Sequence, residues 1–245
     1  MRYVGSKNRL SKDLKPIIES YITKDTKGYL EPFVGGANMI DKIDCDNKVG
    51  CDIHKQLIAL LNKAKTDVDS IPDRITEEEY NKVKDNKENY PDWYVGLVGF
   101  CATYSAKYFG GYARCFKSDG VTPRDMSAES IRNLKKQAPN LKDVEFINCN
   151  FLDLPKSKIK GYVIYCDIPY RGTTKYKTED FPYEKFYDWA TEMSKENIVL
   201  ISEYNMPKEF KCIWQKETGV NFDSNRKSSN KRVEKLFIYD KDVNR

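Results

Sequence analysis

The chain has 245 residues, 40% of them hydrophobic and 32% charged, and its formal net charge is +5. That length allows one large domain, or one core with an insertion, and the apolar share suffices for a hydrophobic core. No run approaches the roughly 18 apolar residues of a membrane span, and the start lacks the apolar stretch of a secretory signal. The small positive charge permits nucleic-acid binding without requiring it.

Seven cysteines and one histidine, His54, are present. The number of cysteines is odd and no CxxC pair occurs, so neither a structural zinc site nor a disulfide framework is expected. Reduced, mostly buried thiols are typical of a cytoplasmic protein.

The N-terminal part predicts alternating strands and helices. In chain order the predicted elements are a helix over 10–22 kinked at Pro16, a strand over 28–33, a helix to about 43, a strand over 48–51 and a helix over 54–65. A β-α-β-α order is typical of a parallel sheet, so the fold class is predicted to be α/β.

From about residue 66 to residue 139 the chain is polar and charged with interspersed aromatics, which predicts an inserted, mainly helical lobe. Beyond it, strands are predicted over 144–148, 162–166, 197–202, 211–214 and 233–239, and a helix over 183–195. The predicted domains are therefore a core made of 1–65 and 140–245, and an insertion over 66–139.

Polar residues stand at or just beyond the ends of four predicted strands: Glu31, Asp52, Asn150 and Asp167. The carboxyl ends of parallel strands share one edge of a sheet, where ligands bind in open α/β folds. We therefore expect the four side chains to line one crevice.

The most informative of these strand ends is Asp167-Ile168-Pro169-Tyr170, which follows the apolar run Val163–Cys166. Pro169 restricts the backbone of Ile168 and stiffens the turn. A carboxylate, a carbonyl and an aromatic ring held together suit a planar group bearing an amine. An ordinary strand-end turn with a solvated aspartate is the alternative interpretation.

Glu31-Pro32-Phe33-Val34-Gly35-Gly36-Ala37 is a glycine-rich turn, and glycines allow a ligand to approach the backbone closely. Neither GxGxxG nor GxxxxGK[ST] occurs, which disfavours NAD enzymes and P-loop NTPases. Asp52, at the next strand end, is an acid of the kind that binds ribose hydroxyls. The turn and Asp52 together suggest a nucleoside-containing cofactor without a pyrophosphate. The alternative interpretation is a plain tight turn that binds no ligand.

Two segments combine features of nucleic-acid contact. Residues 104–117 hold five aromatics and three basic residues with no acid, and residues 224–235 form a basic stretch before the last strand. Such patterns match phosphate contact and base stacking. Core packing in the first and an ordinary solvated loop in the second are the alternatives.

In their order, these segments resemble the Dam-type (D12 class) DNA adenine-N6 methyltransferases, over nearly the whole chain. The resemblance rests on Arg2–Lys7, Glu31–Ala37, Asp52, Asp167–Tyr170 and the stretch Asn230–Glu234. It implies a Rossmann-like methyltransferase core, a target-recognition insertion, and methylation of a flipped-out adenine in double-stranded DNA with S-adenosylmethionine as cofactor. It also implies a protein of a bacterial or phage-infected cell, with no obligate protein partner or metal, and allows a cognate restriction endonuclease.

The resemblance assigns roles to particular residues. The implied catalytic residues are Asp167, Ile168, Pro169 and Tyr170. The implied cofactor-binding residues are Tyr3, Lys7, Glu31, Phe33, Gly35, Asp52, Asn150, Phe151 and Asp167. The candidate DNA-binding residues are Lys107, Tyr112, Arg114, Lys231 and Arg232.

The chain departs from the family pattern at two positions. Ile168 replaces the first proline of Asp-Pro-Pro-Tyr, and Asn150 stands where the family usually has an aspartate against the cofactor adenine. A catalytically weakened or inactive DNA-binding homologue is therefore one alternative. Others are methyltransferases acting on RNA adenine or on glutamine side chains, although the basic aromatic segment argues against a protein substrate.

Overall fold

The computed structural model describes residues 1–116, 118–171, 181–219 and 231–240, with only the backbone of Gly219 and Lys231. The helices are α1 (Ser11–Glu19), α2 (Lys55–Thr66), α3 (Glu77–Asp85), α4 (Asp92–Cys101), α5 (Met126–Gln137) and α6 (Tyr183–Met193). The strands are β1 (Gly28–Glu31), β2 (Lys48–Asp52), β3 (Arg114–Phe116), β4 (Pro123–Asp125), β5 (Val144–Asn148), β6 (Tyr162–Asp167), β7 (Ile198–Ser202), β8 (Phe210–Gly219) and β9 (Lys231–Tyr239).

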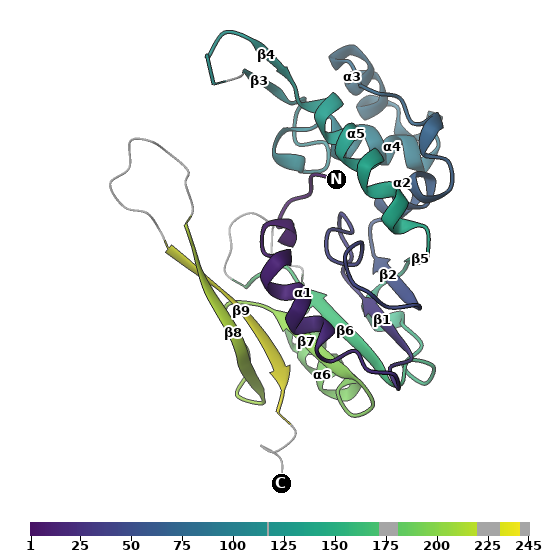
Figure 1. The fold of residues 1–245 in the computed structure, drawn as a ribbon. Helices are drawn as coiled ribbons and strands as arrows, with labels where there is room; N and C mark the ends of the chain where they lie inside the picture. Colours follow the sequence, from purple (N-terminus) through teal and green to yellow (C-terminus); the bar gives the residue numbers. More distant parts are fainter. Residues whose placement is uncertain (117, 172–180, 220–230, 241–245) are drawn as a thin grey trace.

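Seven of these strands form one sheet in the order β5-β2-β1-β6-β7-β9-β8 (Figure 1). The strands from β5 to β7 pair in parallel, whereas β9 lies antiparallel between β7 and β8. The predicted α/β class with a mostly parallel sheet is confirmed, and the arrangement is consistent with a methyltransferase core.

The sheet separates two apolar clusters, and strand β6 contributes to both because its side chains alternate between the faces. Val163 and Tyr165 pack into the first cluster, and Ile164 and Cys166 into the second. The second cluster is covered by α6, whose buried face includes Trp189. Helices α1, α2, α4 and α5 contribute buried residues to the first.

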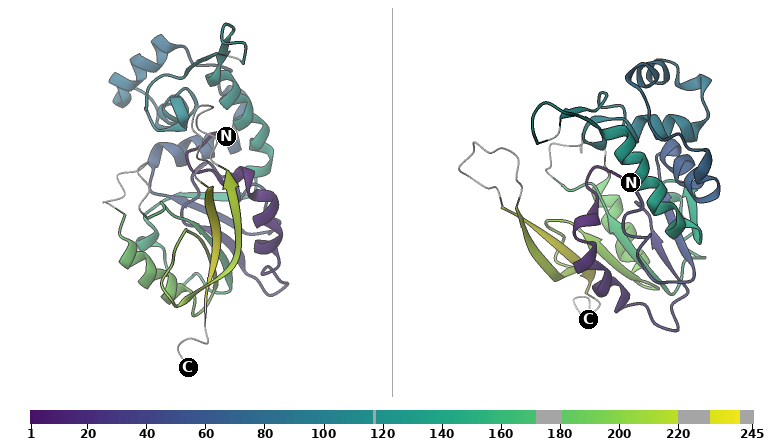
Figure 2. Two further views of the ribbon diagram at one scale, coloured as in Figure 1. Left: turned by 90° about the vertical axis from the view of Figure 1, so that its left-hand side faces the viewer. Right: turned by 45° about the horizontal axis from the view of Figure 1, so that its top comes forward.

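Helices α3, α4 and α5 and the β3–β4 hairpin are gathered at one end of the molecule, as both views of Figure 2 show. Their apolar residues do not form a cluster of their own. Tyr80, Leu97 and Leu134 belong to the same cluster as Tyr29 and Val163 of the sheet. Residues 66–139 therefore share a continuous hydrophobic core with the sheet, and the division into two domains stays a prediction.

Strand and helix positions predicted from periodicity agree with the structure over most of the described chain, although β8 and β9 are longer than predicted and one predicted helix is absent. The helix expected to about residue 43 is absent, and residues 32–43 form turns. Gly35 and Ala37 have φ values of 49° and 55°, which interrupt a right-handed helix. Buried Val34, Met39 and Ile40 hold the segment against the first cluster instead.

Within the described ranges, no helix has the length and apolar character needed to cross a membrane.

Candidate active site

A cavity of about 790 Å³ opens at the carboxyl ends of the parallel strands. From β1 the chain proceeds to β2 and β5 on one side, and later to β6 and β7 on the other, so β1 and β6 flank the topological switch point. Glu31, Asp52, Asn150 and Asp167 all line the cavity, as the strand-end pattern predicts.

The other predicted cofactor and catalytic residues line this cavity too. They are Tyr3, Lys7, Phe33, Gly35, Phe151, Ile168, Pro169 and Tyr170, and they are joined by Arg232 from β9. Segments far apart in the sequence are thus brought to one place, although their roles there stay predictions.

Asp167, the last residue of β6, is bound by a lysine from the start of the chain. Lys7 Nζ lies 2.6 Å from Asp167 Oδ1 and 4.5 Å from the centre of the Tyr170 ring. The side chain of Lys7 is 8% exposed. Burial raises the pKa of Asp167, and the Lys7 ammonium opposes this shift. The ion pair therefore stabilises an ionised carboxylate in a poorly solvated place.

The turn after Asp167 is fixed from both sides. The Ile168 side chain is 2% exposed and belongs to the second apolar cluster. The Tyr183 hydroxyl, at the start of α6, donates a hydrogen bond to the Pro169 carbonyl at 2.9 Å. Packing of Ile168 and the Tyr183 hydrogen bond thus hold a turn in which only Pro169 restricts the backbone covalently.

Tyr170 is surrounded by polar and aromatic partners. Its hydroxyl donates to Glu234 Oε2 at 2.8 Å, and the Tyr204 ring lies edge-on at 4.5 Å between centroids. Burial, followed by the charges of Asp167 and Glu234, raises the pKa of Tyr170, so its ring stays a neutral phenol.

Glu31 at the end of β1 is a nearly fully buried carboxyl group. It accepts a hydrogen bond from the Tyr29 hydroxyl at 2.8 Å and is 3% exposed. Burial raises its pKa well above the usual value, although the Tyr29 bond acts the other way. Such a group favours a cation brought into the cavity.

Asp52 organises the turn beside it. One oxygen accepts from the Gly35 amide at 3.1 Å and the other from the His54 amide at 2.9 Å. These two bonds oppose the rise in the pKa of Asp52 that burial causes. Asp52 therefore joins the glycine-rich turn to the start of α2.

The two glycines of this turn line the cavity and also lie against a side chain of this protein. A Cβ atom at Gly35 or Gly36 would run into the Tyr3 side chain, at 2.7 and 2.8 Å. The missing side chains make room for Tyr3, and the close approach of a ligand to this backbone stays a prediction.

The far end of the cavity is aromatic. Phe33 and Phe151 lie 5.2 Å apart, and Phe181 stacks on Phe151 at 6.0 Å. Asn150 accepts a hydrogen bond from the Leu152 amide through its side-chain oxygen at 3.0 Å, leaving its amide nitrogen as a donor group at the same edge. This end suits a flat, apolar ring with polar edges.

The predicted DNA-binding residues lie elsewhere, Arg232 excepted. Lys107 is exposed, and Arg114 is exposed and paired with Glu77. The Tyr112 hydroxyl donates to the Ile75 carbonyl at 3.0 Å, so this half-buried side chain has a structural role. The side chain of Lys231, like residues 226 and 227 of the basic stretch, lies outside the described residues.

Sequence reasoning missed Glu203, Tyr204 and Glu234. Glu203 is 1% exposed and accepts from the Arg171 amide at 3.0 Å. It follows β7 directly, so the strand-end rule that found Asp167 applies to it as well. Glu234 carries no such signal, because it lies within β9 and reaches Tyr170 only through the fold.

Comparison with known proteins gives one family. No curated protein matches the chain. Residues 3–93 match the family model described as D12 class N6 adenine-specific DNA methyltransferase. This segment contains Tyr3, Lys7, Glu31 and Asp52, whereas Asp167 lies beyond it. The family expected from the sequence is therefore confirmed over residues 3–93, where the chain carries a D12-type N6-adenine DNA methyltransferase domain.

Proposed function

We propose that this protein transfers a methyl group to the N6 amine of an adenine in duplex DNA. One observation carries the proposal: the family-matched segment and the Asp167–Tyr170 turn, which lies outside it, contribute to the same cavity. The strongest direct link is the 2.6 Å contact between Lys7 of that segment and Asp167.

S-adenosylmethionine, which this family typically uses, would supply an electrophilic methyl group on a sulfonium. The lining fits such a molecule, because a buried carboxylate at Glu31 suits its ammonium group and Asp52 suits ribose hydroxyls. Phe151 offers a ring face for the adenine, with Asn150 at its edge. The cavity volume is in the range of small-molecule sites, roughly 300–1,000 Å³.

The target adenine must leave the base stack to enter the cavity, at a cost of a few kcal/mol. Asp167 and the Ile168 carbonyl would then accept the two N–H bonds of its amine, with the base stacked on Tyr170. Those two bonds direct the nitrogen lone pair towards the methyl group. The rate enhancement therefore comes mainly from positioning and electrostatics.

Residues 66–139 are the proposed target-recognition part. The β3–β4 hairpin is a two-stranded ribbon that projects from the molecule (Figure 1), and Arg114, Phe116 and Val121 are exposed on it. A ribbon of this kind fits the major groove of B-DNA. The exposed Lys107 lies on the preceding loop.

The test is transfer of labelled methyl groups to unmethylated duplex DNA, with the modified base identified by mass spectrometry. Asp167→Ala should reduce the rate at least about a hundredfold, because an acceptor for the amine is lost at the reacting atom. Calorimetry with S-adenosylhomocysteine should show that cofactor binding partly survives. Asp153→Ala, at an exposed carboxylate that does not line the cavity, is the matched control.

Near wild-type transfer by Asp167→Ala would contradict the assigned role. Transfer to structured RNA in preference to duplex DNA would favour an RNA methyltransferase. Cofactor and DNA binding without any transfer would favour a homologue that has lost catalysis, for which Ile168 and Asn150 are the suggestive positions.

A further inference from the structure

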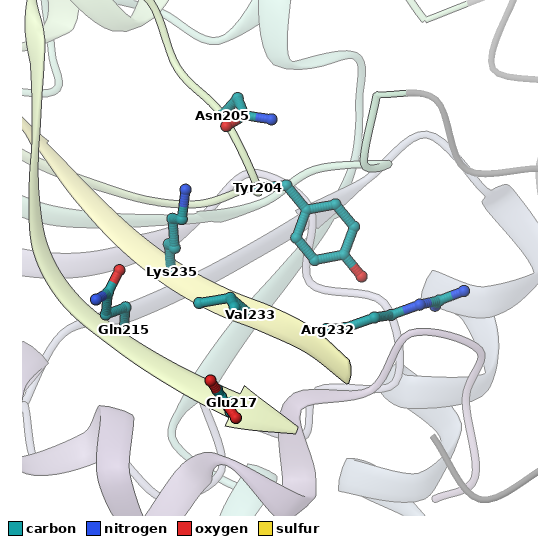
Figure 3. A pocket seen from close by; sticks show the side chains of 7 residues that line it. All are labelled: Tyr204, Asn205, Gln215, Glu217, Arg232, Val233 and Lys235. Atoms are coloured by element: carbon teal, nitrogen blue, oxygen red, sulfur yellow. The ribbon is translucent and has the colours of Figure 1, made fainter. Parts of the chain in front are cut away.

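A second hollow, of about 620 Å³, lies on one face of the β8–β9 hairpin (Figure 3). Gln215 pairs with Lys235 and Glu217 with Val233, and cross-strand partners share a face of a ribbon. Tyr204 and Asn205, which follow β7, border the hollow on the other side. We call it the hairpin groove.

The hairpin groove continues the candidate active site. Tyr204 and Arg232 line both hollows. The Tyr204 ring is also in edge-on contact with Tyr170, against which the target adenine is proposed to stack. A DNA strand that leaves the active site past Tyr204 would therefore enter the hairpin groove directly.

The groove presents groups that bind phosphodiesters. Arg232 and Lys235 are cations, and Asn205 and Gln215 carry amide donors. Side chains of these types make most sugar-phosphate contacts in protein–DNA complexes. Among the described residues that line the groove, Glu217 is the single carboxylate. It pairs across the hairpin with Val233, whereas Lys235 pairs with Gln215, so Glu217 is not the cross-strand partner of Lys235.

We propose that the hairpin groove holds the sugar-phosphate backbone of the target strand next to the flipped adenine, with Lys235 and Arg232 on phosphate oxygens. The inference rests on the proposed function and extends it to a surface outside the catalytic cavity. The groove thus fixes the strand from which the base is withdrawn, and does so without reading sequence.

The test is Lys235→Gln, with Lys24→Gln as the control that makes the same charge change. Lys24 is exposed and precedes β1, so it lies near the amino ends of the parallel strands, opposite to the ends at which the cavity opens. Binding is measured by fluorescence anisotropy of a short labelled duplex with S-adenosylhomocysteine present, across a series of salt concentrations. Lys235→Gln should weaken binding about tenfold for any sequence and lower the salt slope by about 1. Lys24→Gln should leave both unchanged.

A second variant protects the test against a folding defect. Gln215→Glu places a negative charge opposite Lys235 and should weaken DNA binding further, while binding of S-adenosylhomocysteine and the melting temperature stay as in the wild type. In steady-state methylation both variants should raise KM for DNA and leave kcat unchanged.

Equal affinity and equal salt slope for Lys235→Gln, Gln215→Glu and Lys24→Gln would overturn the groove inference. If the wild-type protein still methylates duplex DNA in that case, the proposed function stands and only the groove inference is wrong. A wild-type protein that neither binds nor methylates duplex DNA would overturn both.

Discussion

Lys7 and Asp167 are 160 positions apart in the sequence, and their side chains meet at 2.6 Å. Lys7 also lies over the Tyr170 ring, so one ammonium contacts two of the proposed catalytic groups. Because it opposes the rise in the pKa of Asp167 that burial causes, Lys7 favours the ionised carboxylate, the form that accepts N–H bonds.

Lys7→Met should move the acidic limb of the pH–rate profile to higher pH. Without the ammonium, burial raises the pKa of Asp167 further, so the carboxylate is protonated, and the rate falls, at a pH where the wild type is still active. The profile of kcat for methylation measures this shift. Lys12→Met, an exposed lysine of α1, is the control, and an unchanged acidic limb in Lys7→Met would contradict the role given to the ion pair.

At the scale of elements, helices α2 and α4 approach closely at Gly96 of α4, and a second glycine of α4, Gly99, faces aromatic side chains. A Cβ atom at Gly96 would collide with the backbone of Gln56 in α2, whereas at Gly99 it would meet the side-chain rings of Tyr108 and Phe109. Backbone cannot yield as a side chain can, so the two positions differ in cost.

Gly96→Ala should destabilise the protein by about 1–3 kcal/mol through overpacking. The higher helix propensity of alanine offsets up to about 1 kcal/mol of this loss. At roughly 2–4 °C per kcal/mol, the melting temperature falls by several degrees. Gly99→Ala, in the same helix, should cost less. Thermal unfolding followed by circular dichroism gives the order, and a smaller loss at Gly96 would contradict the close approach.

The elements also show what the sequence can predict. Period-2 and period-3.6 patterns placed β5 at its observed bounds and α2 within one residue. They failed after β1, where positive φ values at Gly35 and Ala37 prevent a helix. They also placed the last strand's start at Val233, although β9 begins at Lys231, because a hairpin strand that projects from the sheet is stabilised by its partner β8 and less by burial.

The site was predictable to the extent that it follows from strand ends. Asp52, Asn150 and Asp167 needed only the rule that parallel strands end at one edge. The groups that reach across from other elements, such as Glu234 on Tyr170 and Tyr183 on the Pro169 carbonyl, depend on tertiary contacts that no local pattern encodes.

Across the whole molecule, the cavity and its surroundings collect carboxyl groups whose pKa values burial raises: Glu31, Asp52 and Asp167 line the cavity, and Glu203 lies next to its lining residue Tyr204. For each, the folded state binds a proton more tightly than the unfolded state. Their contribution to stability is therefore present at low pH and is lost as pH rises above the ordinary pKa. A bound cation would offset that loss.

Glu31→Gln should raise the melting temperature of the ligand-free protein relative to wild type, by a margin that grows as pH rises from the ordinary value of 4.5. The same variant should reduce the thermal stabilisation given by S-adenosylhomocysteine, because a partner for its ammonium is lost. Glu145→Gln, at an exposed carboxylate of β5, should change neither. A difference from wild type that stays constant with pH would contradict the assignment to Glu31.

Ile168 joins the proposed acceptor carbonyl to the second apolar cluster, through a side chain that is 2% exposed. A proline ring would orient that carbonyl by covalent geometry, which heat hardly alters. Packed regions open locally at a lower free-energy cost than global unfolding, so packing around a side chain can loosen on warming before the protein unfolds. Warming should therefore slow the proposed methyl transfer while the sheet is still intact, because the orientation of the acceptor carbonyl depends on the packing of one isoleucine.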